Sequence, residues 1–190
     1  MDVYEAILSR RSIRRFKQKS IPIDVLKKLV NAARLAPSAA NLQPLEYFVI
    51  NEKNLCSEIF ETISWAGYIK PKWTPSTQER PVAYIVMLIK DFENKWYLRD
   101  VSLASENIVI AAEGEGIGSC ILCNINRDKI REVLKIPEKI IIDSIIALGY
   151  KDEKSTVEDL KDKVEYWRDE NNIMHIPKRK LENVMHINNY

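Results

Sequence analysis

The chain reads Arg-Arg-Ser-Ile-Arg-Arg-Phe over residues 10–16, which places four arginines within six positions beside one hydroxyl group. A planar guanidinium binds phosphate in a bidentate manner, so this cluster concentrates anion-binding chemistry. A short basic run is also typical of a solvated face or a nucleic-acid contact. Its spacing alone does not distinguish these two alternatives from a phosphate site. The whole chain carries 29 Lys and Arg against 27 Asp and Glu, whereas duplex-binding domains are far more basic. This near-neutral balance favours a receptor for one small phosphate.

Two amphipathic helices are predicted around this cluster. Before it, residues 3–8 repeat apolar side chains in the i, i+4 rhythm of a short helix, which would deliver the cluster to the core. After it, Pro22 suits the first turn of a second helix with one apolar stripe. Pro37 should end that helix at or before Ala36, because a residue that precedes proline avoids the helical conformation.

Residues 37–44 read Pro-Ser-Ala-Ala-Asn-Leu-Gln-Pro, a loop rich in small residues and amide side chains between two prolines. By itself, this composition also fits an ordinary connection between a helix and a strand. The arginine cluster and this loop, in this order and separated by one helix, resemble two motifs of the nitroreductase family of FMN-dependent oxidoreductases. The resemblance extends over nearly the whole chain and is least specific at residues 64–80.

The resemblance implies an α+β fold, in which helices flank a central, mainly antiparallel sheet of about four or five strands. It implies a single nitroreductase-like FMN-binding domain over residues 1–190 and an intertwined homodimer with two FMN sites at the subunit interface. Residues 177–190 would form a C-terminal arm that packs on the partner subunit. The cofactor would be FMN, with NADH or NADPH as the reductant.

The resemblance also assigns residues of this chain to three parts of FMN. In the family the first motif holds the phosphate and ribityl chain, and the loop lies against the isoalloxazine ring, usually from the other subunit. This division fits the chemistry, because phosphate needs guanidinium and hydroxyl donors, whereas a flat ring with polar edges needs amides on a loop of small residues. The implied residues are Arg10, Arg11, Ser12, Arg14, Arg179 and Lys180 for the phosphate, Pro37, Ser38, Ala39, Asn41 and Gln43 for the ring, and Leu122, Cys123 and Asn124 near its reactive N5. The basic triplet at 178–180 equally fits a solvated chain end.

Three alternating glycines at 114, 116 and 118 invite a dinucleotide-binding interpretation, but that fingerprint follows a strand and opens a helix. Here the glycines end a predicted helix over 97–115 and precede a predicted strand over 120–123. They resemble the family's Gly-Ile-Gly-Ser turn, in which Gly116 and Gly118 would shape the backbone. Gly149 and Tyr150 end a later strand as in the family, although Lys151 stands where a proline commonly follows.

Apolar periodicity predicts the remaining elements. Strands are expected at 46–51, 81–89 and 140–148, and helices at 54–63, from Asn126 onward and at 155–168. The helix over 97–115 is apolar on nearly all sides, which is typical of a buried helix or of the seam of a dimer.

Residues 64–80 show no periodicity and contain two of the four tryptophans. Long aperiodic loops in compact domains often serve as lids or binding walls. In the family this region borders the active site, so Trp65, Tyr68 and Trp73 are candidate substrate-binding residues. Packing in the core or at a dimer interface is the alternative role for these side chains.

The three cysteines and two histidines show no pattern of a metal or redox site. Cys120 and Cys123 are three apart on a predicted strand, so their side chains should point to opposite faces and not form a redox pair. His175 and His186 lack ligand spacing, and no metal is expected. Few cysteines, no signal-peptide pattern and no long apolar run predict a cytoplasmic protein without membrane or nucleic-acid partners.

The resemblance implies a ping-pong oxidoreductase, in which NAD(P)H reduces bound FMN and a nitroaromatic, a quinone or a free flavin then takes the electrons. No catalytic side chain is expected, because the cofactor supplies the electrons and the protein sets orientation and electrostatics. The same motifs fit a flavoenzyme with a different acceptor, such as a flavin-fragmenting enzyme or a reductive dehalogenase. They also leave open a non-catalytic protein that binds or stores FMN, and the arginine cluster leaves open a nucleic-acid-binding protein.

Overall fold

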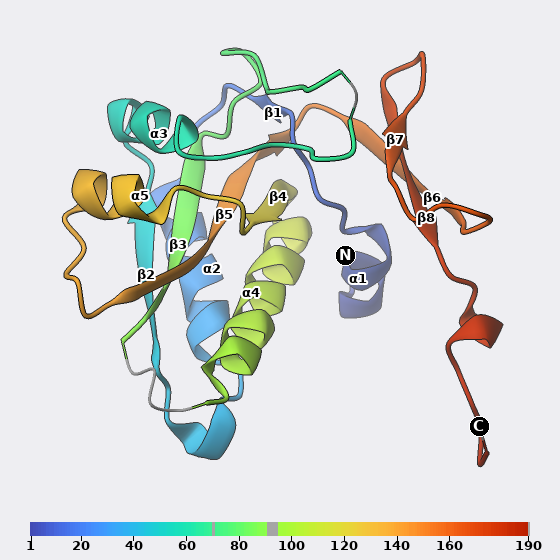
Figure 1. The fold of residues 1–190 in the computed structure, drawn as a ribbon, viewed down its shortest axis with the longest axis horizontal. Helices are drawn as coiled ribbons and strands as arrows, with labels where there is room; N and C mark the ends of the chain where they lie inside the picture. Colours follow the sequence, from blue (N-terminus) through green and yellow to red (C-terminus); the bar gives the residue numbers. More distant parts are fainter. Residues whose placement is uncertain (70, 91–94, 190) are drawn as a thin grey trace.

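In the computed structural model, which describes residues 1–69, 71–90 and 95–189, a five-stranded antiparallel sheet organises the fold (Figure 1). Its strands are β1 (Phe16–Lys17), β2 (Leu45–Ile50), β3 (Ala83–Ile89), β4 (Ile117–Leu122) and β5 (Ile141–Lys151). β5 is central, since β3 pairs with it on one side and β4 on the other, while β2 lies beyond β3 and β1 pairs with the end of β5. β3 and β5 are nearly continuous apolar runs because both of their faces are covered. The predicted α+β fold with a mainly antiparallel sheet is confirmed.

Helices cover both faces of this sheet. α2 (Ile23–Arg34) and α4 (Tyr97–Gly114) pack against each other on one face, whereas α3 (Lys53–Phe60) and α5 (Arg127–Leu134) lie on the opposite face (Figure 1). Each face buries its own apolar cluster. The short α1 (Val3–Ser9) packs beside α4 and carries the chain into the arginine cluster. The helices that the apolar periodicity predicts in this part of the fold are therefore present, with small shifts at their ends.

The apolar stripe of α1 is largely exposed, although the segment that follows this helix does enter the core at Ile13 and Phe16. The buried side chain of this helix is Ala6, whereas Val3, Tyr4 and Leu8 are more than half exposed. On the neighbouring α4, Leu103 is also exposed. An amphipathic helix would normally bury such a stripe against a neighbouring element. Periodicity identified the helix but not the partner of its apolar face.

The predicted helix over residues 155–168 is wrong. This region forms a second, three-stranded sheet, in which β6 (Lys154–Asp159) pairs parallel to β8 (Ile173–Lys178) and β7 (Trp167–Arg168) pairs antiparallel to β8. The i, i+4 spacing of apolar residues in a charged segment favoured a helix. The paired residues of β6 and β8 are 19 positions apart (173 − 154), however, and such non-local pairing overrides weak helical periodicity.

After β8 the chain runs away from the main sheet to its C-terminus (Figure 1). One turn of 3-10 helix, η2 (Leu181–Asn183), lies in this segment, and Val184, Met185 and Ile187 are at least half exposed. An arm with exposed apolar side chains fits the expectation for residues 177–190, and its packing on a partner subunit stays a prediction. Across the described ranges, no helix has both the length and the apolar character needed to cross a membrane.

Candidate functional site

The arginine cluster is held on the sheet where the chain crosses it closely. The Ile13 amide donates a hydrogen bond to the Ser119 carbonyl oxygen of β4 at 2.8 Å. Gly118 faces Gly149 across β4 and β5, and a Cβ at Gly118 would lie 3.0 Å from Ile13. Glycine therefore gives the crossing segment room to approach the sheet. Gly118 lies within β4 and not in the turn as predicted, whereas Gly116, with a φ of +71°, does shape the turn.

Two neighbouring guanidinium groups, from Arg10 and Arg11, begin this segment. Arg10 Nε is 3.6 Å from Glu106 Oε1, and this buried nitrogen has no hydrogen-bond partner in the described part of the chain. Arg11 donates hydrogen bonds to the carbonyl oxygens of Leu8 and Arg10. Burial and the positive charge of Arg10 lower the pKa of Arg11, although the charge of Glu113 acts in the opposite direction. An anion would stabilise two adjacent cations that repel each other in this way.

The buried carboxylate of Glu113, near the end of α4, fixes α1 beside the cluster. It accepts a hydrogen bond from the Ser9 hydroxyl at 2.9 Å and pairs with Lys151 Nζ at 2.6 Å. Glu113 is only 4% exposed, and a buried charge is tolerated when it is paired. Lys151, the residue that departs from the family pattern, therefore supplies the counter-charge for a carboxylate next to the candidate phosphate site.

Arg14 is braced by the segment that follows β5. Its Cζ atom lies 4.5 Å from the centre of the Tyr166 ring, and its Nη1 donates to the Ser12 carbonyl oxygen at 3.3 Å. The Arg14 amide donates to the carboxylate of Glu153, whose side chain is fully buried. Arg14 thus shares the crossing segment with Arg10 and Arg11, but contacts from the second sheet set its orientation.

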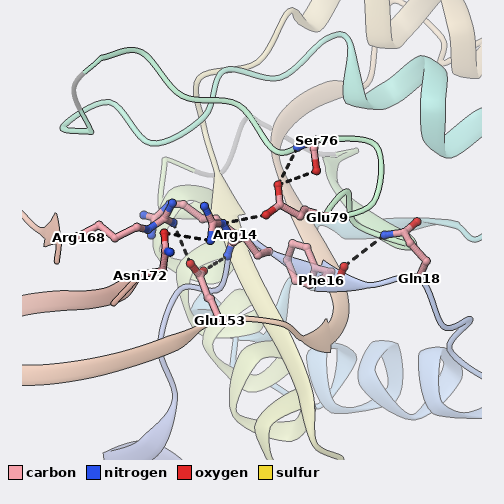
Figure 2. A network of polar contacts seen from close by, with 9 residues as sticks. Arg14, Phe16, Gln18, Ser76, Glu79, Glu153, Arg168 and Asn172 are labelled. Atoms are coloured by element: carbon pink, nitrogen blue, oxygen red, sulfur yellow. Dashed lines mark hydrogen bonds and ion pairs between the residues drawn. The ribbon is translucent and has the colours of Figure 1, made fainter. Parts of the chain in front are cut away.

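Arg15 belongs to a different network. Its Nε lies 3.1 Å from Glu79 Oε1, and its guanidinium and that of Arg168 lie 5.4 and 4.7 Å from the centre of the Trp73 ring. Arg168 Nη2 donates to Glu153 at 3.0 Å, and Figure 2 shows Arg168 and Arg14 converging on that carboxylate. Arg15 therefore fastens the aperiodic loop to the second sheet, and its guanidinium is engaged with protein groups.

The three aromatic candidates for substrate binding lie in different surroundings. Trp65 is 4% exposed and stacks on Phe60, with ring centres 5.7 Å apart. Tyr68 is 53% exposed and contacts the ring of Tyr166 at 5.1 Å. Trp73 contacts both guanidinium groups described above. Trp65 packs in the core, Tyr68 is exposed, and a contact between substrate and any of these three residues stays a prediction.

The amide-rich loop has a strained backbone. Ala40, Asn41 and Gln43 have φ values of 50°, 55° and 50°, and a left-handed conformation costs a non-glycine residue about 1–2 kcal/mol. The Gln43 amide donates to the Ser38 hydroxyl at 3.1 Å, and Ala39–Asn41 forms a short 3-10 turn, η1. A pocket of about 140 Å³ separates part of this loop from α4. Strain that is maintained on an exposed polar loop is typical of functional sites.

The loop and the arginine cluster contact different turns of α4 (Figure 1). The Ala39 amide donates to Asp100 in the first turn of this helix, whereas Arg10 pairs with Glu106 in its middle and Ser9, just before the cluster, donates to Glu113 near its last turn. Asp100 is 6 residues from Glu106 (106 − 100) and 13 from Glu113 (113 − 100), which is roughly 9 and 20 Å at the rise of an α-helix. The contacts of the two motifs are therefore separated along this helix. The expectation that the loop acts on the site of another subunit stays a prediction.

The end of β4 lies on the same sheet edge as the cluster. Leu122 is the last residue of this strand, and Cys123 lies just beyond it, not within it as predicted. The Asn124 carbonyl oxygen accepts a hydrogen bond from the first amide of the aperiodic loop at 3.0 Å. Leu122 follows Ser119, the anchor of the cluster, by three residues, or about 10 Å of strand. Cys120 is buried whereas Cys123 is exposed, so the two thiols diverge as predicted.

The two C-terminal basic candidates have partners within the C-terminal region. Lys180 Nζ lies 3.6 Å from Asp159 Oδ2, and Arg179 donates to the Asn183 carbonyl oxygen. Neither of these partners, Asp159 and Asn183, belongs to the arginine cluster. A role for Arg179 and Lys180 at the phosphate therefore stays a prediction.

Sequence reasoning missed three buried carboxylates that support these motifs, namely Asp100, Glu113 and Glu153. Asp100 and Glu113 are 3% and 4% exposed on α4. An acidic residue in a helix that is otherwise apolar on most sides was an available signal, because a buried carboxylate requires a partner. Glu153 gave no such signal, since it lies in a segment rich in charged residues.

Comparison with known proteins agrees with this arrangement. The sequence model of the Nitroreductase family matches residues 7–150. A protein of Methanothermobacter thermautotrophicus named NADH dehydrogenase/NAD(P)H nitroreductase is 32% identical over 168 residues, which cover 85% of this chain and 84% of that protein. An FMN-dependent nitroreductase from Clostridium difficile superposes with a TM-score of 0.68 at 26% identity, covering 95% of this chain and 96% of its own.

A further solved structure shares the fold at lower identity. Iodotyrosine deiodinase bound to FMN and 3-iodo-L-tyrosine superposes with a TM-score of 0.72 at 18% identity, covering 86% of this chain and 97% of its own. The family match spans the arginine cluster, the amide-rich loop and the glycine turn from which the resemblance was predicted. The chain therefore belongs to the nitroreductase family.

Proposed function

We propose that the protein is an FMN-dependent oxidoreductase that takes reducing equivalents from NADH or NADPH and passes them to a small-molecule acceptor. Family membership supports this proposal, as do the names of the Methanothermobacter relative and the Clostridium structure. The observation that carries it is the course of the segment that begins with Arg10 and Arg11, because the Ile13 amide in this segment donates to the Ser119 carbonyl oxygen of β4, the strand whose end would border the ring. One chain thereby offers a phosphate end and, at the end of β4, one border of the flavin ring.

The phosphate end fits FMN in both charge and hydrogen-bonding capacity. Arg10 has a buried Nε without a hydrogen-bond partner among the described residues. The positive charge of Arg10 also lowers the pKa of Arg11 and so disfavours its charged form. Arg14 and the Ser12 hydroxyl would add a third cation and a neutral donor from the same segment. A phosphate dianion would relieve the repulsion between the guanidinium groups, which riboflavin cannot do because it carries no phosphate.

The ring end requires a second copy of the chain. Because α4 separates the amide-rich loop from the cluster, Pro37, Ser38, Ala39, Asn41 and Gln43 would reach the ring from the other subunit of a homodimer. The exposed apolar side chains of α1 and α4 would be covered in such a dimer, and the exposed arm over residues 177–190 would cross to the partner. Leu122, Cys123 and Asn124 would border the ring from the first subunit.

FMN held at this site would supply the redox chemistry, namely the capacity to take up a hydride and to release electrons to an acceptor. The side chains of this site bind and orient the flavin, and its amides would donate hydrogen bonds to the polar edge of the ring. A nitroaromatic, a quinone or a free flavin is the proposed acceptor. A reductive dehalogenase is the second candidate, because iodotyrosine deiodinase, whose structure holds FMN and 3-iodo-L-tyrosine, shares the fold.

Anaerobic reduction tests this proposal directly. The purified protein, saturated with FMN, should lose its yellow absorbance when NADH or NADPH is added and recover it when a nitroaromatic or a quinone follows. Recovery with 3-iodotyrosine but with neither of those acceptors would favour the dehalogenase. Bound FMN that neither nicotinamide reduces would contradict the proposed enzyme and indicate a storage protein.

A further inference from the structure

A buried carboxylate on α4 is hydrogen-bonded to the amide-rich loop. Asp100 lies in the first turn of this helix and is only 3% exposed. Its Oδ1 accepts a hydrogen bond from the Ala39 amide at 3.0 Å, a contact between residues 61 positions apart in the sequence. A charged acceptor makes this bond stronger than one between neutral groups.

The loop needs support of this kind because its own backbone is strained. Ala40, Asn41 and Gln43 all have positive φ, and none of them is a glycine. The hydrogen bond from the Gln43 amide to the Ser38 hydroxyl joins two residues of the loop to each other. The bond to Asp100 is different, since it ties the loop to a helix that packs on the main sheet. Strained segments persist when surrounding structure holds them.

We infer that Asp100 is a positioning residue for the flavin ring. Its carboxylate holds the Ala39 amide and thereby fixes the turn that presents Asn41 and Gln43 to the ring of FMN in the partner subunit. This inference rests on the proposed function. Because Leu103 on the same helix is exposed and apolar, Asp100 also links the proposed dimer surface to the conformation of the loop.

The inference predicts a specific pattern of affinities. The ring is common to FMN and riboflavin, so loss of the Asp100 contact should weaken both ligands by the same factor and leave their affinity ratio unchanged. Loss of an arginine that reads the phosphate should instead reduce that ratio. A general loss of stability would lower the melting temperature, but it would not change the affinities of the folded fraction in this way.

Three variants test the contact from the side of α4. Asp100→Ala removes the acceptor and should weaken FMN and riboflavin by about tenfold each, the scale of one hydrogen bond to a charged group. Asp100→Asn keeps an oxygen that can face the Ala39 amide and should stay within about threefold of the parent. Ser102→Ala is the matched control, because Ser102 is exposed on the same helix and its hydroxyl donates to the Leu98 carbonyl oxygen.

A fourth variant, Ala39→Pro, removes the donor without changing α4. Proline is tolerated at the first position of a helical turn, and Ser38 before it is already extended, with φ −129° and ψ 153°. Ala39→Pro should therefore reproduce the equal loss of FMN and riboflavin affinity, and Asp100→Ala added to it should cause little further loss. This variant carries the test if Asp100→Ala does not fold.

Amide hydrogen exchange of the flavin-free protein separates this inference from the proposed function. The Ala39 amide should exchange slowly in the parent and in Asp100→Asn, and about tenfold faster in Asp100→Ala. A parent with a protected Ala39 amide that binds no flavin would overturn the proposed function and the positioning role with it. A parent that binds FMN while Asp100→Ala keeps both affinities within twofold would overturn the positioning role alone. The positioning role would also be overturned if Asp100→Asn bound flavin as weakly as Asp100→Ala, or if Asp100→Ala changed the ratio of FMN to riboflavin affinity.

Discussion

The four arginines of residues 10–15 are identical side chains in different surroundings. The positive charges of Arg10 and Arg11 lie next to each other and are only partly compensated by carboxylates, whereas Arg15 pairs with Glu79 and contacts the Trp73 ring. We expect Arg10→Ala or Arg14→Ala to weaken FMN binding by about 1.5–3 kcal/mol each, the usual contribution of a hydrogen bond to a charged group. Riboflavin affinity should change far less in both variants.

Arg15→Ala is the matched control for this prediction. It should loosen the aperiodic loop and leave the ratio of FMN to riboflavin affinity close to that of the parent. Flavin fluorescence titration measures both affinities. Equal losses of FMN and riboflavin in Arg10→Ala would mean that this arginine does not read the phosphate.

Cys123 tests whether the backbone or the thiol matters at the end of β4. Burial, followed by the charge of Asp143, raises the pKa of the Cys123 thiol, which makes it a poor nucleophile near neutral pH. Cys123→Ala should therefore keep FMN and turnover within a few-fold of the parent. Cys123→Pro deletes an amide and fixes φ, so it should lose much of both. Steady-state turnover that collapses in the alanine variant with FMN still bound would instead support a redox role for the thiol.

At this scale, the sequence predicts residues that belong to a local pattern. Arg10, Ser12 and Asn41 are found within short motifs, so their residue types and spacing single them out as candidates. Asp100 and Glu153 were not identified as supports, because their partners are distant in the sequence. Which amide a buried carboxylate accepts from is decided by tertiary packing, and no local spacing encodes it.

Among the secondary-structure elements, the buried ones were the most predictable. The strand β3 and the helix α4 agree closely with their predicted ranges, because each has a long apolar pattern that only burial satisfies. The second sheet was missed. β6 is exposed at four of its six positions and pairs parallel to β8, with β7 between them in the sequence, so a charged segment with a few spaced apolar residues appeared helical.

His175 gives this second sheet a defined pH dependence. Burial by itself would lower the pKa of His175, but hydrogen bonds with Asp169 at 3.3 Å and Glu158 at 3.1 Å, together with their charges, raise it. The protonated ring therefore stabilises the folded state fully below its unfolded pKa of about 6.5, and this contribution is lost as pH rises through the folded value. The pKa values of Glu158 and Asp169 are lowered, chiefly by hydrogen bonds from Trp167 and the Ile173 amide, so their contribution is lost on acidification below about pH 4.

The expected result is a stability difference that depends on pH. The melting temperature of the parent should exceed that of His175→Gln most clearly between about pH 5 and 6, and the gap should narrow toward pH 8. Thermal unfolding followed by circular dichroism over this range measures it. A gap that widens from pH 6 to pH 8 would show that the neutral ring is the stabilising form.

The pair between Glu113 and Lys151 should contribute to stability at the junction of α4 and β5. Lys151→Met would leave a nearly buried carboxylate without its cation, which costs about 3 kcal/mol by analogy with other buried pairs. The melting temperature should fall by roughly 6 to 12 °C for a chain of this size. Lys139→Met, at an exposed lysine, should have little effect, and adding Glu113→Gln to Lys151→Met should recover part of the loss. An unchanged melting temperature in Lys151→Met would contradict this role.

At the scale of the whole molecule, the arginine cluster and the amide-rich loop of one chain contact different turns of α4. Apolar side chains on α1, α4 and the C-terminal arm are exposed. Both features follow if the working molecule is a dimer. Because ligand that binds only the dimer stabilises it by mass action, FMN should shift any monomer–dimer equilibrium toward dimer and raise the melting temperature. Sedimentation with and without FMN measures the shift.

Mixed dimers test the central claim, that each flavin site combines the cluster of one subunit with the loop of the other. One variant carries Arg10→Ala and Arg14→Ala, and the second carries Asn41→Ala and Gln43→Ala. Binding is measured at an FMN concentration at which neither variant binds flavin by itself. After the two are mixed and re-paired, half of the dimers are mixed, and two-fold symmetry leaves each of these with one intact and one doubly defective site. Bound FMN should then return to roughly one quarter of the parent level, together with bleaching by NADH or NADPH. A mixture that binds no FMN, although mixed dimers have formed, would contradict a site shared between subunits.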